Sequence, residues 1–358
     1  MRGLTKGLLI AGFSIALDGC FERIAANGTV GVMDRASPAL QSFADPAIAE
    51  ASLPYSITQM EGLLLVVPQN RLLRTNLMRA LGSFGFAFLE DRMEEAELAN
   101  DDARMAYYAN RASIAYSRGK EVGFETLTMM DGTDGGSAAA VHRGVDAWRA
   151  YLQRFDERAQ VPVLFWLGYN WARHISLNKD NPDVLADLPY AIAIFERVMQ
   201  VDPDFNYSAP RIAMASYYAR AAASLGGEPE RSRQLFEEAI HRYPNFLTYK
   251  VMMARVYAVM VQDRALFTRL LQEVIDAGDV MPEQRLANQI AKRRARRYLS
   301  QIEDLVAPAD DSAGTPSTDA PAADAPAADA PAVPAADAPA APAATPEAPA
   351  ATPAPAAH

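Results

Sequence analysis

Cysteine and histidine are scarce in this sequence of 358 residues, which contains one cysteine, Cys20, and four histidines. A single thiol can form neither a disulfide within the chain nor a Cys/His zinc site. No His-Glu-x-x-His spacing occurs, and the Gly-x-Ser-x-Gly, Walker and dinucleotide-binding patterns are also missing. The Gly-rich run 132–136 follows no strand pattern and is predicted to be a loop. We therefore expect no catalytic residue, metal site or cofactor, and predict that the protein is not an enzyme.

Large apolar side chains are nearly missing from residues 307–358, which repeat Ala, Pro and Asp and contain half of the 24 prolines. Such a composition cannot offset the entropy of folding, and its prolines favour an extended polyproline conformation. We predict that 307–358 is a disordered Ala/Pro/Asp-rich tail.

Basic residues are also missing beyond Arg297, so the net charge of −10 is concentrated in the tail. Without the seven acids of the tail, the rest of the chain has a charge of about −3. One basic cluster, Lys292–Arg297, lies near the end of the last predicted helix, where cations interact favourably with the helix dipole. A nucleic-acid partner is not expected for an exported and nearly neutral body, whereas pairing of this cluster with acids of the tail or of a partner stays open.

The N-terminus has the pattern of an export signal. Arg2 and Lys6 precede or flank an apolar run at 8–17, which is too short to span a bilayer as a helix. The run ends in Leu-Asp-Gly-Cys20, which resembles a bacterial lipobox, although Asp18 stands where a small or apolar residue is usual. Acylation of Cys20 would anchor the protein to a membrane and explain an unpaired exported cysteine. Ordinary signal cleavage nearby and a buried cytosolic N-terminus are the alternatives.

Helical periodicity and almost no strand pattern are found from about residue 35 to residue 305. In one example, Ala191, Ile194, Phe195, Val198 and Met199 share one face of an amphipathic helix, which must pack against a neighbour. The longest helices are expected at 70–96 and 101–130. Six prolines are predicted to mark helix boundaries: Pro68, Pro162, Pro182, Pro203, Pro244 and Pro282.

An internal repeat supports an all-α fold. The segment from Phe195 to Phe205, an amphipathic helix ending in Pro-Asp, aligns with Phe236 to Phe246 at an offset of 41. This is the pattern of tetratricopeptide-type helical hairpins, whose usual period is about 34 residues. Stacked hairpins of this kind form a solenoid with a concave groove. We predict a signal peptide at 1–19, a lipidated segment at 20–55, a tetratricopeptide-like solenoid domain at 56–306 and the tail at 307–358.

An aromatic segment in the middle of the chain is the best candidate for ligand or partner binding. Trp and Tyr combine a large apolar face with one polar group, which suits an amphiphilic ligand. The same residues at helical spacing also fit packing in a hairpin core, and both interpretations stay open. The candidate binding residues are Trp166, Tyr169, Asn170, Trp171, Arg173, Tyr217, Tyr218 and Asn288.

From Cys20 to about Leu305, the chain resembles the T component of tripartite ATP-independent periplasmic (TRAP) transporters. The order and spacing of several stretches carry this resemblance: Glu61-Gly-Leu-Leu-Leu-Val-Val-Pro-Gln-Asn-Arg-Leu-Leu73, Phe84-Gly-Phe-Ala-Phe-Leu-Glu90, Ala115-Tyr-Ser-Arg-Gly119, Val163-Leu-Phe-Trp-Leu-Gly-Tyr-Asn-Trp-Ala172, Gly226-Gly-Glu-Pro-Glu, Asp263 with Phe267, and Arg285-Leu-Ala-Asn-Gln-Ile-Ala-Lys-Arg-Arg-Ala295.

The resemblance implies a lipoprotein of the bacterial periplasm, lipid-anchored to a membrane, with the outer membrane favoured over the inner. It also implies a periplasmic solute-binding protein as partner, a homo-oligomer such as a trimer, and a cleft for an apolar or organic-acid ligand. A different class of function stays open, namely an envelope scaffold whose helical repeats bind an assembly partner and whose tail spans the cell wall.

Overall fold

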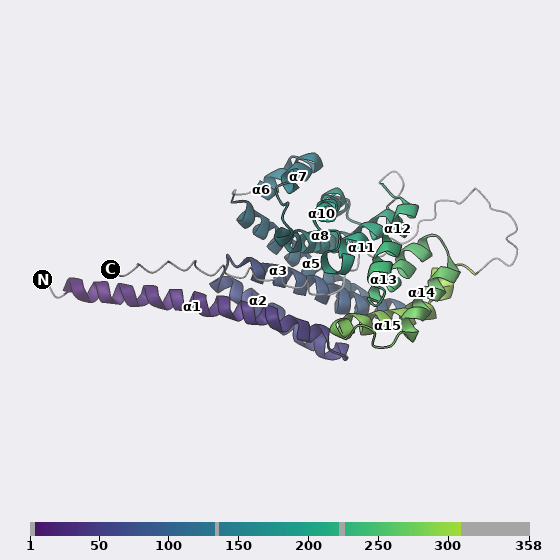
Figure 1. The fold of residues 1–358 in the computed structure, drawn as a ribbon, viewed down its shortest axis with the longest axis horizontal. Helices are drawn as coiled ribbons and strands as arrows, with labels where there is room; N and C mark the ends of the chain where they lie inside the picture. Colours follow the sequence, from purple (N-terminus) through teal and green to yellow (C-terminus); the bar gives the residue numbers. More distant parts are fainter. Residues whose placement is uncertain (1–3, 133–135, 222–225, 309–358) are drawn as a thin grey trace, which may run out of the picture.

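The computed structural model describes residues 4–132, 136–221 and 226–308, with side chains from Phe21 onward. These residues form helices and no strand, which confirms the all-α prediction (Figure 1). The α-helices are α1 (Leu4–Gln41), α2 (Pro46–Val66), α3 (Arg71–Phe84), α4 (Glu90–Leu98), α5 (Asp102–Asp131), α6 (Gly136–His142), α7 (Val145–Leu152), α8 (Val161–Leu177), α9 (Pro182–Leu185), α10 (Leu188–Val201), α11 (Phe205–Arg220), α12 (Pro229–Arg242), α13 (Thr248–Met252), α14 (Arg264–Asp276), α15 (Arg285–Ser300) and α16 (Ile302–Leu305).

Two π-helical turns interrupt longer helices. The turn η1 (Gly85–Leu89) joins α3 to α4, and η4 (Met253–Ala258) continues α13. π-Helices are rare, and most are single turns within α-helices that are frequently found at functional sites. Short 3₁₀ turns, η2 (Arg158–Gln160) and η5 (Pro282–Gln284), precede α8 and α15.

Local sequence signals explain where several helices begin and end. The Asn70 side chain accepts a hydrogen bond of 2.8 Å from the Leu73 amide, and Asp101 accepts one of 3.0 Å from the Arg104 amide. Such N-caps satisfy amide groups that have no partner within the helix. The helix α5 ends at Asp131, and Gly132 follows in the left-handed conformation with φ 66°.

The six prolines that were predicted at helix boundaries lie between helices or in first turns, whereas Pro38, Pro54 and Pro210 lie within helix bounds. The predicted loop at 132–136 falls largely on residues 133–135, which are outside the described part. The same is true of the predicted tail from residue 309 onward.

Hydrogen bonds between successive hairpins repeat the periodicity of the sequence. Trp148 Nε1 donates to the Tyr190 carbonyl at 3.0 Å, and Arg197 Nε donates to the Phe155 carbonyl at 3.0 Å, each across 42 positions. The Tyr249 hydroxyl donates to the Tyr207 carbonyl, again across 42 positions. These separations agree with the repeat offset of 41, because equivalent positions of neighbouring hairpins lie side by side.

The two ends of this stack of hairpins also meet. The helix α15 contacts both α1 and α2, and Arg285 Nη1 donates to the Ser42 carbonyl at 3.0 Å (Figure 1). In a simple solenoid each repeat contacts only its neighbours. Contacts between neighbouring hairpins are therefore seen together with a contact between first and last helices that the sequence did not indicate, and the predicted solenoid is not confirmed.

The helix α8 lies in the core between α3 and α5, and three glycines allow its close approach. A Cβ atom on Gly82 would lie 2.9 Å from Tyr169 Cδ1, and one on Gly123 would lie 2.7 Å from Leu167 Cδ1. A Cβ atom on Gly119 would overlap the amide group of Asn170.

Of the described helices, none combines the length and the apolar character that a bilayer span requires.

We predict that Gly119→Ala lowers the free energy of unfolding by about 1–3 kcal/mol, because the added methyl group overpacks the contact with α8. Gly62→Ala is the matched control, since Gly62 is helical, exposed and has no atom within 4 Å of an added Cβ. This control should raise stability by about 0.5–1 kcal/mol. Urea unfolding measures both effects, and equal changes in the two variants would contradict the packing of α8.

Candidate functional site

A cavity of about 460 Å³ lies where the first helices of the chain meet the last ones. Its volume falls within the range of small-molecule sites in proteins, about 300–1,000 Å³. Residues of α1, α2, α3, η1, α13, η4 and α15 line it, and they include Leu40, Leu53, Met60, Phe86, Phe88, Met252, Leu286 and Ile290. Most of the wall is therefore apolar and comes from segments far apart in the sequence.

The cavity opens on the side of α1 and α2. Its lining residues there include the exposed Ala36, Ala39, Phe43 and Gln59, whereas Phe86 and the lining residues of α15 are buried. The exposed part of the wall thus lies on the side of α1 and α2, and η1 and α15 form its buried floor.

Three arginines, Arg79, Arg255 and Arg294, are among the lining residues, and no aspartate or glutamate is among those that the structure describes. Burial lowers the pKa of Arg79, and the attraction of nearby Asp34 only partly offsets this effect. Arginine nevertheless keeps its charge in proteins because its intrinsic pKa is so high. The wall consequently combines apolar surface with guanidinium groups, and carboxylates that do not line the cavity lie near two of them, Asp34 near Arg79 and Asp91 near Arg294. Guanidinium groups beside apolar surface suit an amphiphilic anion.

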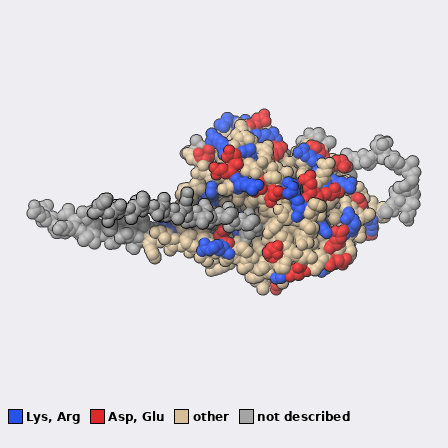
Figure 2. Space-filling model, in the orientation of Figure 1, with Lys and Arg blue, Asp and Glu red and all other residues tan. Residues whose placement is uncertain are grey.

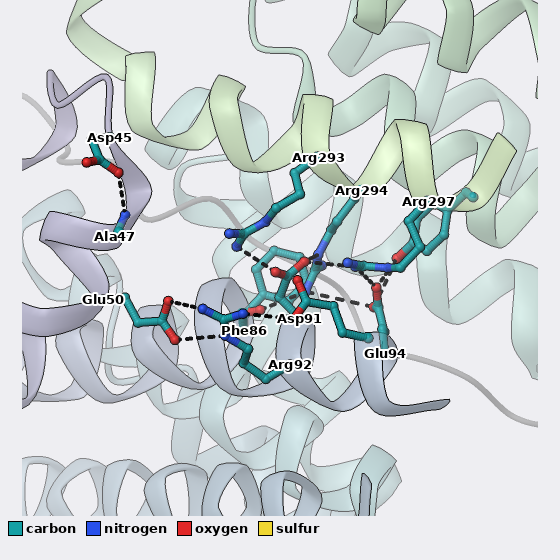
Figure 3. Close-up of polar contacts among 12 residues, drawn as sticks. Asp45, Ala47, Glu50, Phe86, Asp91, Arg92, Glu94, Arg293, Arg294 and Arg297 are labelled. Atoms are coloured by element: carbon teal, nitrogen blue, oxygen red, sulfur yellow. Dashed lines mark hydrogen bonds and ion pairs between the residues drawn. The ribbon is translucent and has the colours of Figure 1, made fainter. Parts of the chain in front are cut away.

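The floor of the cavity is held by a buried ion cluster between α4 and α15 (Figure 3). Asp91 Oδ2 lies 2.5 Å from Arg293 Nη2, and Asp91 Oδ1 lies 2.8 Å from Arg297 Nη2. Glu94 pairs with Arg297 and accepts a hydrogen bond of 2.9 Å from the Tyr298 hydroxyl. Three residues of the basic cluster at 292–297, namely Arg293, Arg294 and Arg297, therefore have acidic partners within the folded body.

Arg294 belongs both to the ion cluster and to the cavity wall. Its Nη2 donates to the Phe86 carbonyl at 2.7 Å, its Nε lies 3.4 Å from Asp91 Oδ1, and its guanidinium group lies 3.9 Å from the centre of the Phe86 ring. The π-helical turn η1 supplies Phe86 and leads into Asp91. The wide turn thus positions an aromatic ring and a carboxylate for the same arginine.

A second buried ion pair uses the predicted binding residue Arg173. This side chain pairs with Glu90, whose Oε1 also accepts a hydrogen bond of 2.5 Å from the Tyr116 hydroxyl. Both Arg173 and Glu90 are fully buried. Arg173 therefore contacts a carboxylate of the neighbouring hairpin and does not reach the cavity.

The other candidate binding residues of α8 are also buried in the core. The Asn170 amide donates to the carbonyls of Met78 and Trp166, and Trp171 Nε1 donates to Asp187 Oδ2 at 2.9 Å. Trp166 and Tyr169 pack edge to face with ring centres 5.5 Å apart. These contacts favour the packing alternative that the sequence left open.

The remaining candidates lie in later hairpins. Arg231 lies over the ring of Tyr218 at 4.5 Å, and Tyr217 packs beside Tyr218. Asn288 accepts a hydrogen bond from the Leu247 amide and donates one to the Asn245 carbonyl, both 3.0 Å long.

None of the eight candidates lines the cavity. The residues that line the cavity were missed in the sequence analysis. Among the polar ones is Arg79, and no local sequence pattern distinguishes it from an arginine that faces solvent.

Figure 2 shows acidic and basic side chains interspersed over the visible face of the body, without a continuous basic area on that face. Within the described residues, no group of three potential metal ligands comes together. The cavity is therefore the feature of the described structure that is best suited to a ligand.

We predict that Asp91→Asn lowers the free energy of unfolding at pH 7 by about 3–5 kcal/mol, as expected when one partner of a buried ion cluster is removed. Burial would raise the pKa of Asp91, but the guanidinium groups of Arg294, Arg297 and Arg293 outweigh it, and the pKa is lowered. Because the pKa of Asp91 is lower in the folded state than in the unfolded chain, ionised Asp91 stabilises the fold at pH values above about 3.9, the pKa of Asp in the unfolded chain. This stabilisation is lost as the pH falls through the pKa of Asp91 in the folded state.

Urea unfolding at pH 7 and at pH 3 measures this contribution. The wild-type protein should lose stability between the two pH values, and Asp91→Asn should lose less. Exposed Asp304 provides the control, and Asp304→Asn should follow the wild type at both pH values. A wild-type pH dependence in Asp91→Asn would contradict the role of the cluster.

Comparison with known proteins places the chain in a family. The family model described as TRAP transporter T-component matches residues 43–306, which extend from the turn before α2 to the end of α16. An uncharacterized protein of Treponema pallidum (strain Nichols) is 22% identical over 266 residues, covering 73% of this chain and 80% of the relative. The resemblance inferred from the sequence is confirmed: the chain belongs to the TRAP transporter T-component family and is a transporter-associated protein.

Proposed function

We propose that the protein is a periplasmic lipoprotein that binds an amphiphilic organic anion in the cavity and acts together with the solute-binding protein of a TRAP transporter. The observation that carries the ligand part of the proposal is the cavity itself, which is mostly apolar, has its exposed lining residues on the side of α1 and α2, and has three arginines but no acid among its described lining residues. Membership of the T-component family supports the transport context.

The energetics of such a cavity favour a ligand with both an apolar chain and a charge. Burial of each CH₂ group contributes about 0.8 kcal/mol, so a chain of about ten would contribute on the order of 8 kcal/mol. Association costs on the order of 4–15 kcal/mol in lost freedom of motion. The apolar chain alone offsets a cost near the lower end of that range and only part of a cost near the upper end, and interactions of an anionic head group with arginine would supply more.

The location of the protein also forms part of the proposal. Lipidation at Cys20 concerns a side chain outside the described part, and it rests on the export signal and the lipobox-like ending. We place the protein on the periplasmic face of a membrane, with the outer membrane favoured. The solute-binding protein as partner, and a homo-oligomer such as a trimer, are proposals that rest on the family resemblance.

We predict that Ala287→Phe abolishes ligand binding while leaving the protein folded. Ala287 is a small residue of α15 in the cavity wall, and a phenyl ring there would occupy space that a chain needs. Dodecanoate binding is measured by isothermal titration calorimetry, and circular dichroism checks the fold. Ala265→Phe, on an exposed position of α14, should bind like the wild type. Unchanged binding in Ala287→Phe would exclude the cavity as the ligand site.

We further predict that chemical crosslinking in intact cells captures the solute-binding protein of a TRAP system with this protein. The wild-type protein should fractionate with membranes and carry an acyl group, and this acyl group should be missing from Cys20→Ala. Mass spectrometry of the crosslinked material identifies the partner. Repeated capture of other envelope proteins without any solute-binding protein would instead support an envelope scaffold.

A further inference from the structure

Two pairs of hydrogen-bonded polar residues connect α1 and α3 along one edge of the cavity, and a third pair of polar residues follows in the same register. Asp34, Ser37 and Gln41 follow one another on one face of α1 at helical spacing, and Asn76, Arg79 and Ser83 do so on α3. Asn76 Nδ2 donates to Asp34 Oδ1 at 3.0 Å, and Arg79 Nη2 donates to Ser37 Oγ at 3.3 Å, each across 42 positions. The same register places Gln41 opposite Ser83.

This third pair differs from the first two. Gln41 and Ser83 both line the cavity, and they are only 6% and 4% exposed. Gln41 Oε1 and Ser83 Oγ have no hydrogen-bond partner among the described residues. Buried polar atoms are nearly always hydrogen-bonded, because leaving one without a partner costs its full desolvation. Two such atoms at the wall of a ligand-sized cavity therefore indicate a position for a polar group of the ligand.

We propose that Gln41, Ser83 and Arg79 bind the carboxylate head group of the ligand, with its apolar chain lying along Phe86 and Ile290. This inference rests on the proposed function, and it deepens that function by naming the chemical class and the site of the head group. A carboxylate only accepts hydrogen bonds, and the three side chains offer a hydroxyl, an amide NH₂ and a guanidinium group as donors. The amide of Gln41 can present either its oxygen or its nitrogen to the ligand, because the two ends are interchangeable in shape.

The other arginines of the wall are less suited to this role. Arg294 is held by Asp91 and by the Phe86 carbonyl as part of the ion cluster. Arg255 lies over the ring of Tyr298 at 5.7 Å, on the side of the cavity formed by η4 and α15. Near Arg79, by contrast, the neighbouring polar pair offers two further groups to the same ligand atoms.

The test compares dodecanoate with 1-dodecanol, which have the same chain length and differ in the charge of the head group. Titration calorimetry on the full-length protein should show dodecanoate binding at least about tenfold more tightly, which corresponds to about 1.4 kcal/mol. In the double variant Gln41→Leu/Ser83→Ala this preference should fall to within about twofold, while dodecanol binding changes little. The unfolding midpoint of the ligand-free double variant should equal or exceed that of the wild type, because two costly buried polar atoms are removed.

The chain offers a matched control. Ser232 Oγ and Gln284 Oε1 are also buried without a hydrogen-bond partner among the described residues, but neither residue lines the cavity. The double variant Ser232→Ala/Gln284→Leu should keep the tenfold preference.

Two results would overturn the head-group site while leaving the proposed function in place. One is equal affinity of the wild type for the two probes. The other is a preference that survives in Gln41→Leu/Ser83→Ala and disappears in Arg255→Gln. Failure of the wild type to bind either probe would instead overturn the proposed ligand-binding function, and the head-group site with it.

Discussion

The buried ion cluster between α4 and α15 is the interaction on which the rest of the structure depends. Asp91 and Glu94 come from the first third of the chain, and Arg293, Arg294 and Arg297 come from the last long helix. Charges that lose their hydration at this depth are stable only while their partners stay in place. The cluster therefore sets the position of α15 against α4, and the contacts of α15 with α1 and α2 complete the closure between the first and last helices.

The cavity is a consequence of this closure. Its walls come from both ends of the chain, and Arg294 contributes to the ion cluster and to the wall at once. A ligand in the cavity would contact α1, α3 and α15 together, and any compound that binds only the folded state stabilises it by mass action. Ligand binding and closure of the stack are thus expected to support each other.

Much of the fold could be predicted because its signals are local. Caps such as Asn70 and Asp101, the left-handed Gly132 and the amphipathic periodicity depend on residues within one or two turns. The repeat offset of 41 even indicated the separation at which Trp148 and Tyr190 are hydrogen-bonded.

The candidate site could not be predicted in the same way. The aromatic residues of α8 drew attention by composition, but composition does not distinguish a core helix from a ligand-binding helix, and Trp166 lies in the core.

The sequence by itself determined the all-α class, the hairpin repeat and the family, since each rests on periodicity or the order of motifs. The signal peptide, the lipid anchor and the disordered tail stay predictions. Only the tertiary structure decided that the basic cluster at 292–297 pairs with Asp91 and Glu94, about 200 positions earlier. It also decided that Gln41 and Ser83 share a cavity wall. The physical reason is that the partner of a buried charge or polar atom is set by how distant helices pack, and no local pattern in the chain carries that information.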